Sequence, residues 1–438
     1  MTRTFFKRKK KRACVIGLDG VPRTLLGSMM DSGVMPKTRD IVARGHIEPM
    51  TAALPEISSV SWSTFMTGKN PGTHGIFGFT DLKDSSYALR YPSFRDLRSP
   101  TIWDILGDHR MRSVVINQPA TYPARPIPGV LISGFVAIDL EKAVTPLSYY
   151  STLKEKNYEI DVDAQECRDD AERLFASLDR LLAARRSIMD DLWEHEDWNL
   201  FEIVLTGTDR LHHFLWDAWE NARHPHHAAF LDYYRAIDDF IGHAFSKFRE
   251  TQCDGGFFIL SDHGFCGARH EVYINTILQR EGFLDLAPGS SSLEGITEKT
   301  KAFALDPARI YINRKGRFPR GSVEKDDAAP LVKDLKAVFE NLGFNGEKIV
   351  RRLFTGEEAY SGPHAHQGPD LLCVPQDGFD LKGRVGAERI VGDRRLQGMH
   401  TWDNAFLFSL DVSSIGAEGG LNIIDVPAAI LRSLGIEI

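Results

Sequence analysis

The sequence lacks three features that would each assign it to a large class of proteins. No apolar run approaches the roughly 20 residues that a transmembrane helix requires. The five cysteines are scattered and none forms a CxxC pair, which is typical of reduced thiols rather than of a disulfide framework. The formal net charge is -7, whereas a general nucleic-acid-binding protein usually carries a basic surplus. We therefore expect a cytoplasmic protein with no specific nucleic-acid partner.

Positive charge is concentrated in one place, the basic run Lys7–Arg12 before the apolar segment Ala13–Leu18. The apolar part is too short for a signal peptide, and Asp19 closes it without a small-residue cleavage site. We interpret residues 1–12 as a basic, disordered arm whose simplest role is to increase solubility. Weak contact with an anionic membrane surface through Lys7–Arg12 is the alternative.

Short apolar runs alternate with long helical patterns along the rest of the chain. Runs such as Ala13–Leu18 and Phe201–Leu205 are typical of strands covered on both faces. Ala171–Trp198 and Leu231–Arg249 instead carry apolar residues at helical spacing. This alternation predicts an α/β fold with a mostly parallel central sheet, in which ligands gather at the carboxyl ends of the strands. Further strands are predicted at Val114–Ile116, Val130–Ile132, Phe257–Leu260, Leu371–Val374 and Ala405–Leu410.

Two segments look less like core. They lie near residues 81–106 and 288–347, and the second has Gly/Ser runs and clustered charge. We expect both to form cap insertions in one catalytic domain of residues 13–438.

Aspartate and histidine residues follow or flank several predicted strands. A lone Asp at a strand end is commonly just a helix cap, but the combined set exceeds what one tetrahedral ion takes. If a helix begins near Thr208, Asp209 and His213 lie one turn apart and can bind one ion. Mixed carboxylate and imidazole ligands without thiolate favour Zn²⁺ first and Mn²⁺ second, and two such ions are typical of phosphoryl transfer. The candidate ligands are Asp19, Asp209, His213, Asp262, His263 and His400.

A hydroxyl-rich turn that runs into a helix, Leu54–Gly68, offers a nucleophile. A helix N-terminus presents free N–H groups and a positive dipole end to a phosphate. A metal-bound serine there can lose its proton and attack phosphorus. Helix starts also favour serine as a cap, so these considerations leave open the choice among Ser58, Ser59, Ser61 and Ser63.

These elements occur in an order that extends over nearly the whole chain. They are Val15–Gly20, Pro55–Gly68, Asn70–Ile76, Thr208–His213, Leu260–Gly264 and His400. As an ordered set they resemble the type I phosphodiesterase/nucleotide pyrophosphatase branch of the alkaline phosphatase superfamily. The resemblance implies an alkaline-phosphatase-like three-layer sandwich with cap insertions. It also implies a metal-dependent hydrolase that acts on a small-molecule phosphoester.

The resemblance also assigns roles to individual residues. It places one ion between Asp19, Ser58, Asp262 and His263, and the other between Asp209, His213 and His400. Ser58 matches the family nucleophile because it lies nine residues before the pair Thr67-Gly68, and it predicts a phosphoseryl intermediate. The family's diesterases usually have threonine at this position. Ser61 is the predicted ligand of a non-bridging phosphate oxygen.

Phosphodiester hydrolysis is the expected activity, with two alternatives. A phosphomonoesterase or phosphomutase on the same site would need more positive charge, and Arg210 and Arg269 lie near the motifs. The other alternative is a non-catalytic phosphate-binding protein. His364 and His366 compete with His400 for the late ligand position. The sequence predicts neither the natural substrate nor the oligomeric state.

Overall fold

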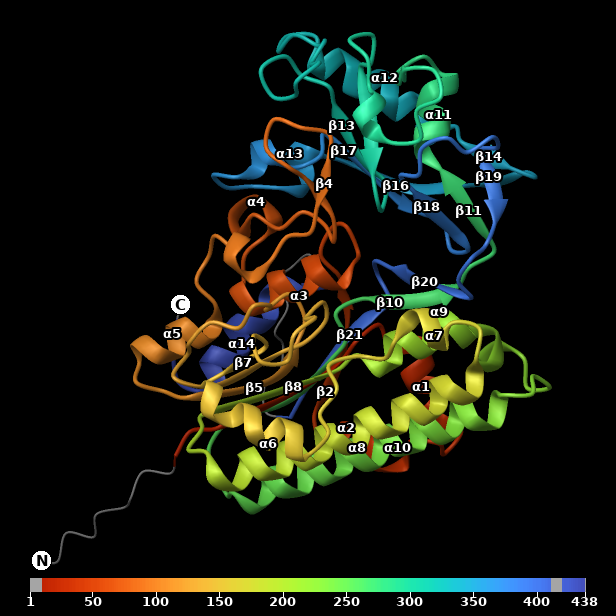
Figure 1. Ribbon diagram of the computed structural model, residues 1–438. Coiled ribbons are helices and arrows are strands. Elements are labelled where there is room, and N and C mark those ends of the chain that lie inside the picture. The colour runs from red at the N-terminus through yellow and green to blue at the C-terminus, as the bar shows by residue number, and fades with distance from the viewer. Residues whose placement is uncertain (1–9, 411–419, 438) are drawn as a thin grey trace, which may run out of the picture.

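A nine-stranded mixed sheet forms the centre of the larger lobe of the computed structural model, which describes residues 10–410 and 420–437 (Figure 1). The inner strands β9, β1, β8, β5 and β6 run parallel to one another, whereas β21 and β7 pair antiparallel with the strands beside them. In spatial order the sheet contains β22 (Leu421–Asn422), β2 (His46–Thr51), β21 (Ala405–Ser409), β9 (Phe257–Leu260), β1 (Ala13–Leu18), β8 (Leu200–Leu205), β5 (Ser113–Gln118), β6 (Gly129–Ser133) and β7 (Val144–Thr145).

Helices cover both faces of this sheet. Every residue of the apolar strands β1 and β8 is therefore buried. Alternate residues of β1 enter different cores: Ile16 and Leu18 face one side, Ala13 and Val15 the other. The first face packs against α1 (Arg23–Asp31), α2 (Pro36–Val42), α8 (Ala171–His195), α9 (Gly207–Glu220) and α10 (His227–Glu250). The second packs against α3 (Ser58–Thr67), α5 (Ile102–Asp108) and α14 (Val426–Ser433). The three layers confirm the predicted α/β class with its mostly parallel sheet.

The smaller lobe has a hydrophobic core of its own, in which Val272, Phe303, Leu335 and Leu381 take part. The segment predicted near 288–347 lies inside this lobe. The segment 81–106 is divided: Tyr87 joins this core, whereas Phe94, Ile102, Trp103 and Leu106 pack in the larger lobe. One sheet contains β12 (Ala302–Leu305), β13 (Arg309–Ile312), β17 (Leu371–Pro375) and β16 (Val350–Thr355). Another contains β18 (Phe379–Lys382), β11 (His270–Tyr273) and β19 (Val391–Asp393), with α11 (Ile274–Arg280) and α12 (Ala328–Glu340) packed nearby.

One predicted strand lies in a different sheet from the one expected. Leu371–Val374 forms most of β17, which pairs antiparallel with β13 and β16 in the smaller lobe and not with the central sheet. A short apolar run indicates burial between layers but carries no information about which sheet it joins.

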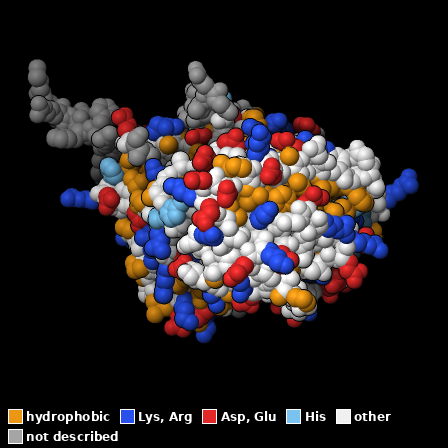
Figure 2. Space-filling view, turned by 90° about the horizontal axis from the view of Figure 1, so that it is seen from above, with side chains coloured by type: hydrophobic (Ala, Val, Ile, Leu, Met, Phe, Trp, Pro, Cys, Tyr) orange, Lys and Arg blue, Asp and Glu red, His pale blue; other side chains and the backbone are white. Residues whose placement is uncertain are grey.

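The two lobes are joined beside the central sheet by the antiparallel pair β10 (Gly264–Gly267) and β20 (Gly398–Thr401). Figure 2 views the molecule from above Figure 1, and basic and acidic side chains are intermixed on the face that it shows. Among the described residues, no helix is long and apolar enough to span a bilayer.

Only residues 10–12 of the predicted basic arm are among the described residues, and they contact the larger lobe. The Arg12 backbone N–H donates to the Asp254 carbonyl at 2.9 Å, and its guanidinium lies 4.5 Å from the centre of the Trp198 ring. Lys7 and the residues around it lie outside the described part of the chain.

Candidate active site

The carboxyl ends of β1, β8 and β9 lie side by side, and each is followed within a few residues by a predicted metal ligand. The register places Gly17 of β1 beside both β8 and β9. Asp19 then follows β1, Asp262 follows β9, and Asp209 lies in the first turn of α9 after β8. His213 lies one helical turn beyond Asp209 on the same face of α9.

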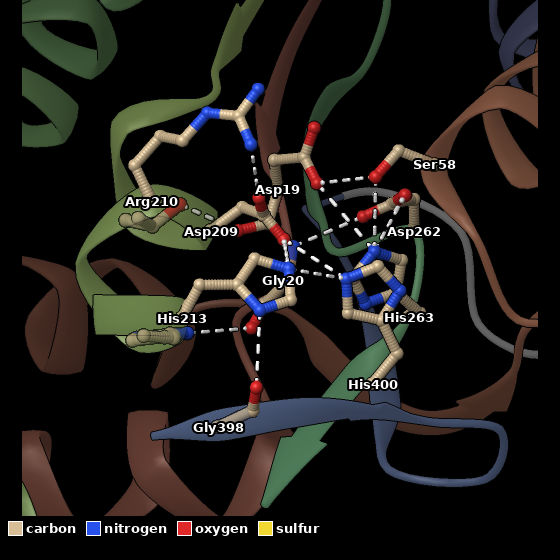
Figure 3. A network of polar contacts seen from close by, with 12 residues as sticks. Asp19, Gly20, Ser58, Asp209, Arg210, His213, Asp262, His263, Gly398 and His400 are labelled. Atoms are coloured by element: carbon tan, nitrogen blue, oxygen red, sulfur yellow. Dashed lines mark hydrogen bonds and ion pairs between the residues drawn. The ribbon is translucent and has the colours of Figure 1, made fainter. Parts of the chain in front are cut away.

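Two further side chains reach this group from distant segments (Figure 3). Ser58 is the first residue of α3, and His400 lies in β20, where pairing with β10 places it opposite Phe265. The structure thus brings all the predicted metal ligands together: Asp19, Ser58, Asp209, His213, Asp262, His263 and His400.

The Ser58 hydroxyl faces two acceptors. Its Oγ donates to Asp19 Oδ1 at 3.1 Å and lies 3.1 Å from His263 Nε2. Trp62, one turn along α3, donates from Nε1 to the other Asp19 oxygen at 3.2 Å and fixes that carboxylate. Because a hydroxyl has a single hydrogen, Ser58 satisfies only one of the two acceptors at a time.

Asp262 contributes a buried oxygen that lacks a hydrogen-bond donor. Its Oδ1 accepts from the Gly20 backbone N–H at 3.1 Å, whereas Oδ2 has no hydrogen-bond partner among the described residues. His263 Nε2 lies 3.4 Å from Oδ2. An unpaired buried carboxylate oxygen is costly, and such an atom is suited to bind a cation.

A second cluster forms around Asp209. Its Oδ1 lies 3.2 Å from His400 Nε2 and 3.4 Å from His213 Nε2, and these two nitrogens are 3.0 Å apart. Its Oδ2 lies 3.6 Å from Arg210 Nη1. The rings of His263 and His400 stack with their centres 3.8 Å apart, so the two clusters adjoin.

Backbone carbonyls fix the orientation of all three imidazoles. Because a carbonyl only accepts, each Nδ1 carries a hydrogen, and each Nε2 faces the cluster. The contacts are His213 Nδ1 to Gly398 O at 3.0 Å, His263 Nδ1 to Gly264 O at 3.0 Å, and His400 Nδ1 to Glu56 O at 2.9 Å.

Burial dominates the electrostatics of these groups. It raises the pKa of Asp262 to about 7 and, together with the charges of Asp262 and Asp209, raises the pKa of Asp19 well above its usual range. Burial lowers the pKa of His213 to about 3, which keeps that ring neutral. For Asp209 burial acts in the raising direction, but His213, His400 and Arg210 hold its pKa well below the ordinary value. Divalent cations would favour ionised carboxylates and neutral imidazoles here.

The donor set fits two divalent ions. One group of candidate ligand atoms comes from Asp19, Asp262 and His263, and another from Asp209, His263 and His400, with the atoms of each group within 4.8 Å of one another. His263 belongs to both groups, so the distances alone do not assign it to one ion. Bare imidazole nitrogens facing carboxylates are the arrangement that Zn²⁺ and Mn²⁺ sites use.

A cavity of about 170 Å³ adjoins the two clusters. Ser58, Ser59 and Arg210 contribute to its wall together with the rings of Phe79 and Phe135. A neighbouring cavity of about 390 Å³ extends between the lobes and shares Ile57, Phe79, His213 and His400 with the first. The site therefore has a small compartment beside Ser58 and a larger one toward the smaller lobe.

Ser61 does not line either cavity. It is fully buried one turn into α3, its backbone N–H donates to the Ile57 carbonyl at 2.9 Å, and its Oγ has no hydrogen-bond partner among the described residues. Ser59 is the serine of this helix that reaches the cavity beside Ser58. The phosphate-binding role predicted for Ser61 stays a prediction.

Other histidines near the motifs have different partners. His364 lies beside α4 (Pro71–His74), where its backbone N–H donates to the Gly72 carbonyl at 2.8 Å. His212 points away from the clusters, with Nε2 2.6 Å from the Tyr234 hydroxyl. His400, and not His364 or His366, supplies the third imidazole of the site.

Of the two arginines near the motifs, Arg210 lines the cavity and Arg269 does not. Arg269 forms an exposed ion pair with Glu347 at 2.6 Å. Phe79 and Phe135, which stack with ring centres 5.5 Å apart, were not predicted from the sequence. Their only sequence signal is the aromatic residue type, because the cavity assembles them from separate loops.

The comparisons with known proteins agree with this geometry. The family model for type I phosphodiesterase / nucleotide pyrophosphatase matches residues 13–403, and the chain belongs to that family. This confirms the predicted family and the predicted class of enzyme, a phosphoester hydrolase of a metal-dependent superfamily. No curated protein matches the sequence.

Several solved structures share the fold at low sequence identity. Phosphonoacetate hydrolase from Sinorhizobium meliloti 1021, in complex with phosphonoacetate, matches with a TM-score of 0.66 and 14% identity over 98% of this chain and 96% of that chain. The alkaline phosphatase PafA matches with a TM-score of 0.62 and 14% identity over the same shares. An inactive variant of murine ectonucleotide pyrophosphatase / phosphodiesterase 5, in complex with AMP, matches with a TM-score of 0.57 and 13% identity over 98% and 96%. They confirm the alkaline-phosphatase-like fold.

Proposed function

We propose that the chain hydrolyses phosphoesters at a two-metal site, with Ser58 as the nucleophile and a phosphoseryl intermediate. The observation that carries the proposal is the position of Ser58 Oγ, 3.1 Å from both Asp19 Oδ1 and His263 Nε2. Two divalent ions held by the clusters would favour the serine alkoxide and offset the negative charge of the phosphoryl group. Zn²⁺ is the first candidate and Mn²⁺ the second.

The residues of the chain support each half of the reaction. Ser58 Oγ attacks phosphorus, the Oγ–P bond forms, and the bond to the leaving oxygen breaks with its electron pair. Water then attacks the phosphoseryl group, releases the phosphate product and regenerates the Ser58 hydroxyl. The small compartment beside Ser58 has room for the phosphoryl group, and the cavity between the lobes has room for the leaving group.

The N-terminus of α3 supplies donors for a phosphoryl oxygen. The backbone N–H groups of Ser58 and Ser59 make no hydrogen bond within the described residues. They lie in the first turn of the helix, where no carbonyl of a preceding turn is available to accept from them. Such N–H groups, with the positive end of the helix dipole, stabilise negative charge that develops on a non-bridging oxygen.

Two substrate classes are compatible with this chemistry. The family description favours a phosphodiester, and diester hydrolysis is the first candidate function. One observation, the arginine in the wall of the small compartment, favours a phosphomonoester. Bis-(p-nitrophenyl) phosphate and p-nitrophenyl phosphate are matched probes, because they share a leaving group and differ in the second ester.

Turnover of the two probes by the wild-type protein and by Ser58→Ala tests the proposal. We expect the variant to lose on the order of 10³-fold or more in kcat with both esters while it retains its metal. Ser63→Ala is the matched control, because Ser63 lies on the same helix and its Oγ donates only to the Ser59 carbonyl, at 2.6 Å. Retained activity in Ser58→Ala would remove the mechanism. Two bound metals without turnover of either ester would instead support a binding protein.

A further inference from the structure

A further cavity, of about 860 Å³, adjoins the cavity between the lobes on the side away from Ser58. We call it the distal cavity. The cavity between the lobes, of about 390 Å³, has the metal ligands His213 and His400 in its wall. A molecule that binds at the metal site can therefore extend through this cavity into the distal one. The residues that line both cavities are Thr80, Asp306, Lys382 and Leu396.

Three arginines in the wall of the distal cavity have free donors. The side chains of Arg168, Arg384 and Arg395 donate no hydrogen bond within the part of the chain that the structure describes. Arg395 Nε lies 3.7 Å from Glu271 Oε2, but this oxygen already accepts from the Tyr273 hydroxyl at 3.0 Å. The Arg384 guanidinium lies 5.6 Å from the centre of the Tyr273 ring, a cation–π contact that leaves its N–H donors available.

The three arginines reach the distal cavity from both lobes. Arg168 follows α7 (Ala164–Cys167), and Cys167 packs in a core of the larger lobe. Arg384 follows β18 and Arg395 follows β19, both in the smaller lobe. In Figure 1, α7 lies on the side of the larger lobe that faces β18 and β11. Positive charge that converges on a concave space from two sides favours an anionic ligand.

The carboxylates in this wall do not neutralise the arginines. Lys382 brings the cations of the wall to four, against the three carboxylates of Glu271, Glu294 and Asp306. Glu271 has the hydroxyl donor described above, and Asp306 Oδ1 accepts from the Gly383 backbone N–H. Glu294 is the carboxylate of the wall without a side-chain hydrogen bond or ion pair among the described residues. Free positive groups therefore outnumber free negative groups in the distal cavity.

We propose that the distal cavity binds a second oxyanion, a phosphate or a carboxylate, at the far end of the substrate, and that Arg384 and Arg168 bind it. The proposal rests on the proposed function of the metal site. Guanidinium groups donate to both kinds of oxyanion through pairs of N–H groups. The substrate is then an elongated phosphoester with an anionic group at each end, one at Ser58 and the other in the distal cavity.

Competitive inhibition by three series of phosphonates of increasing chain length tests the proposal. Alkylphosphonates have one anionic end, alkane-α,ω-diphosphonates have two, and ω-carboxyalkylphosphonates carry a carboxylate at the second end. None has an ester bond to cleave, and each is tested against turnover of the p-nitrophenyl ester that the wild-type protein hydrolyses faster.

We expect a chain length at which the second anionic end lowers the inhibition constant about 10- to 100-fold relative to the alkylphosphonate, the size of one charge-assisted hydrogen bond. Shorter chains should show no such gain, because their second end does not reach the distal cavity. The charged end that gives the larger gain identifies the oxyanion as phosphate or carboxylate.

Arg384→Ala and Arg168→Ala should each reduce this gain by about three- to tenfold. Both arginines are exposed, so neither replacement should prevent folding. Glu294→Gln is the control for the sign of the charge in the same wall, and it should retain or increase the gain. Arg269→Ala is the control for a surface arginine that lies outside the distal cavity, because it is exposed and paired with Glu347.

The proposal is overturned if no chain length shows a gain, or if both arginine variants retain it. It is also overturned if Glu294→Gln loses as much of the gain as Arg384→Ala, because the shape of the wall and not its charge would then select the ligand. These results would leave the proposed function intact, since the same assay measures turnover of the p-nitrophenyl ester. Absence of turnover in the wild-type protein would instead contradict the proposed function.

Discussion

The Nε2 atoms of His213 and His400 lie 3.0 Å apart, and each ring gives its Nδ1 hydrogen to a backbone carbonyl. Burial lowers the pKa of His213 to about 3, whereas for His400 burial is outweighed by the hydrogen bond to Asp209, which raises its pKa. A cation between these nitrogens and Asp209 Oδ1 would take the place of the His400 proton. The backbone therefore prepares the imidazoles for a metal before one binds.

The number of metal ions bound per chain should depend on which histidine of the two clusters is removed. We expect about two divalent ions per chain, as measured by elemental analysis of protein purified without chelator. His213→Ala removes a ligand from one cluster and should lower the content toward one ion, whereas His263→Ala affects both groups and should lower it further. A chelator should abolish turnover and lower the thermal midpoint, and Zn²⁺ or Mn²⁺ should restore both. Equal metal loss in the two variants would argue against a His263 side chain that contributes to both metal sites.

Asp262→Asn should affect stability and metal binding in opposite directions. The variant removes a buried charge whose Oδ2 atom has no donor, and it retains an oxygen for the Gly20 N–H. The metal-free variant should therefore gain about 1–2 kcal/mol in the free energy of unfolding at pH 8, where Asp262 is otherwise largely ionised. Its affinity for metal should fall. Urea unfolding of the metal-free proteins measures the first effect, and a less stable variant would contradict the account.

Glu202, far from the metal ligands, should make stability depend on pH. It is fully buried in β8, Oε2 accepts from Trp103 Nε1 at 3.1 Å, and burial raises its pKa from 4.5 to about 8. Between these two values the folded state retains a proton that the unfolded state has lost, so stability falls as pH rises and levels off above the folded pKa. Relative to Glu202→Gln, the wild-type protein should lose about 3 kcal/mol between pH 5 and 8. Urea unfolding at several pH values measures this difference. If the free energy of unfolding changes with pH by the same amount in both proteins, Glu202 is not the source of the pH dependence.

Gly17 should tolerate no side chain, because β1 and α3 approach each other there. A Cβ at Gly17 would lie 2.5 Å from the Trp62 ring, which donates to Asp19 Oδ2. Gly17→Ala should cost about 1–3 kcal/mol and disturb Asp19, with a fall in kcat and in metal content. Gly27→Ala in α1 is the control, because a Cβ there meets nothing within 4 Å and should stabilise the helix by about 0.5–1 kcal/mol. Thermal unfolding and turnover of both variants test this prediction. A Gly17→Ala variant as stable and as active as the wild type would contradict it.

The sequence predicted the features that depend on local patterns. The apolar run Ala13–Leu18 coincides with β1, and α9 begins at Gly207, so Asp209 and His213 lie one turn apart as expected. Both results follow from burial and helical spacing, which a single segment encodes. The predicted ligands after β1, β8 and β9 lie close together because the carboxyl ends of parallel strands meet at one edge of the sheet.

The features that were missed depend on contacts between distant segments. The direction of Arg210 is fixed by Asp161 and Phe135, which come from other loops, and no pattern around residue 210 encodes it. Ser61 lies one turn inside α3 and is fully buried, and its predicted role at the phosphate stays a prediction. The strand Leu371–Val374 was recognised, but its sheet depends on partners elsewhere in the chain.

The most direct test of the central claim is to trap the covalent intermediate on Ser58. Protein mixed with excess p-nitrophenyl phosphate is quenched in acid within milliseconds and digested, and the peptide that contains Ser58 is analysed by mass spectrometry. The account predicts a phosphoryl group on Ser58 that is absent from unreacted protein and from Ser58→Ala. If the wild-type protein turns over the ester at full rate and no phosphoserine accumulates under any quench time, or if another residue carries the phosphate, the claim is contradicted.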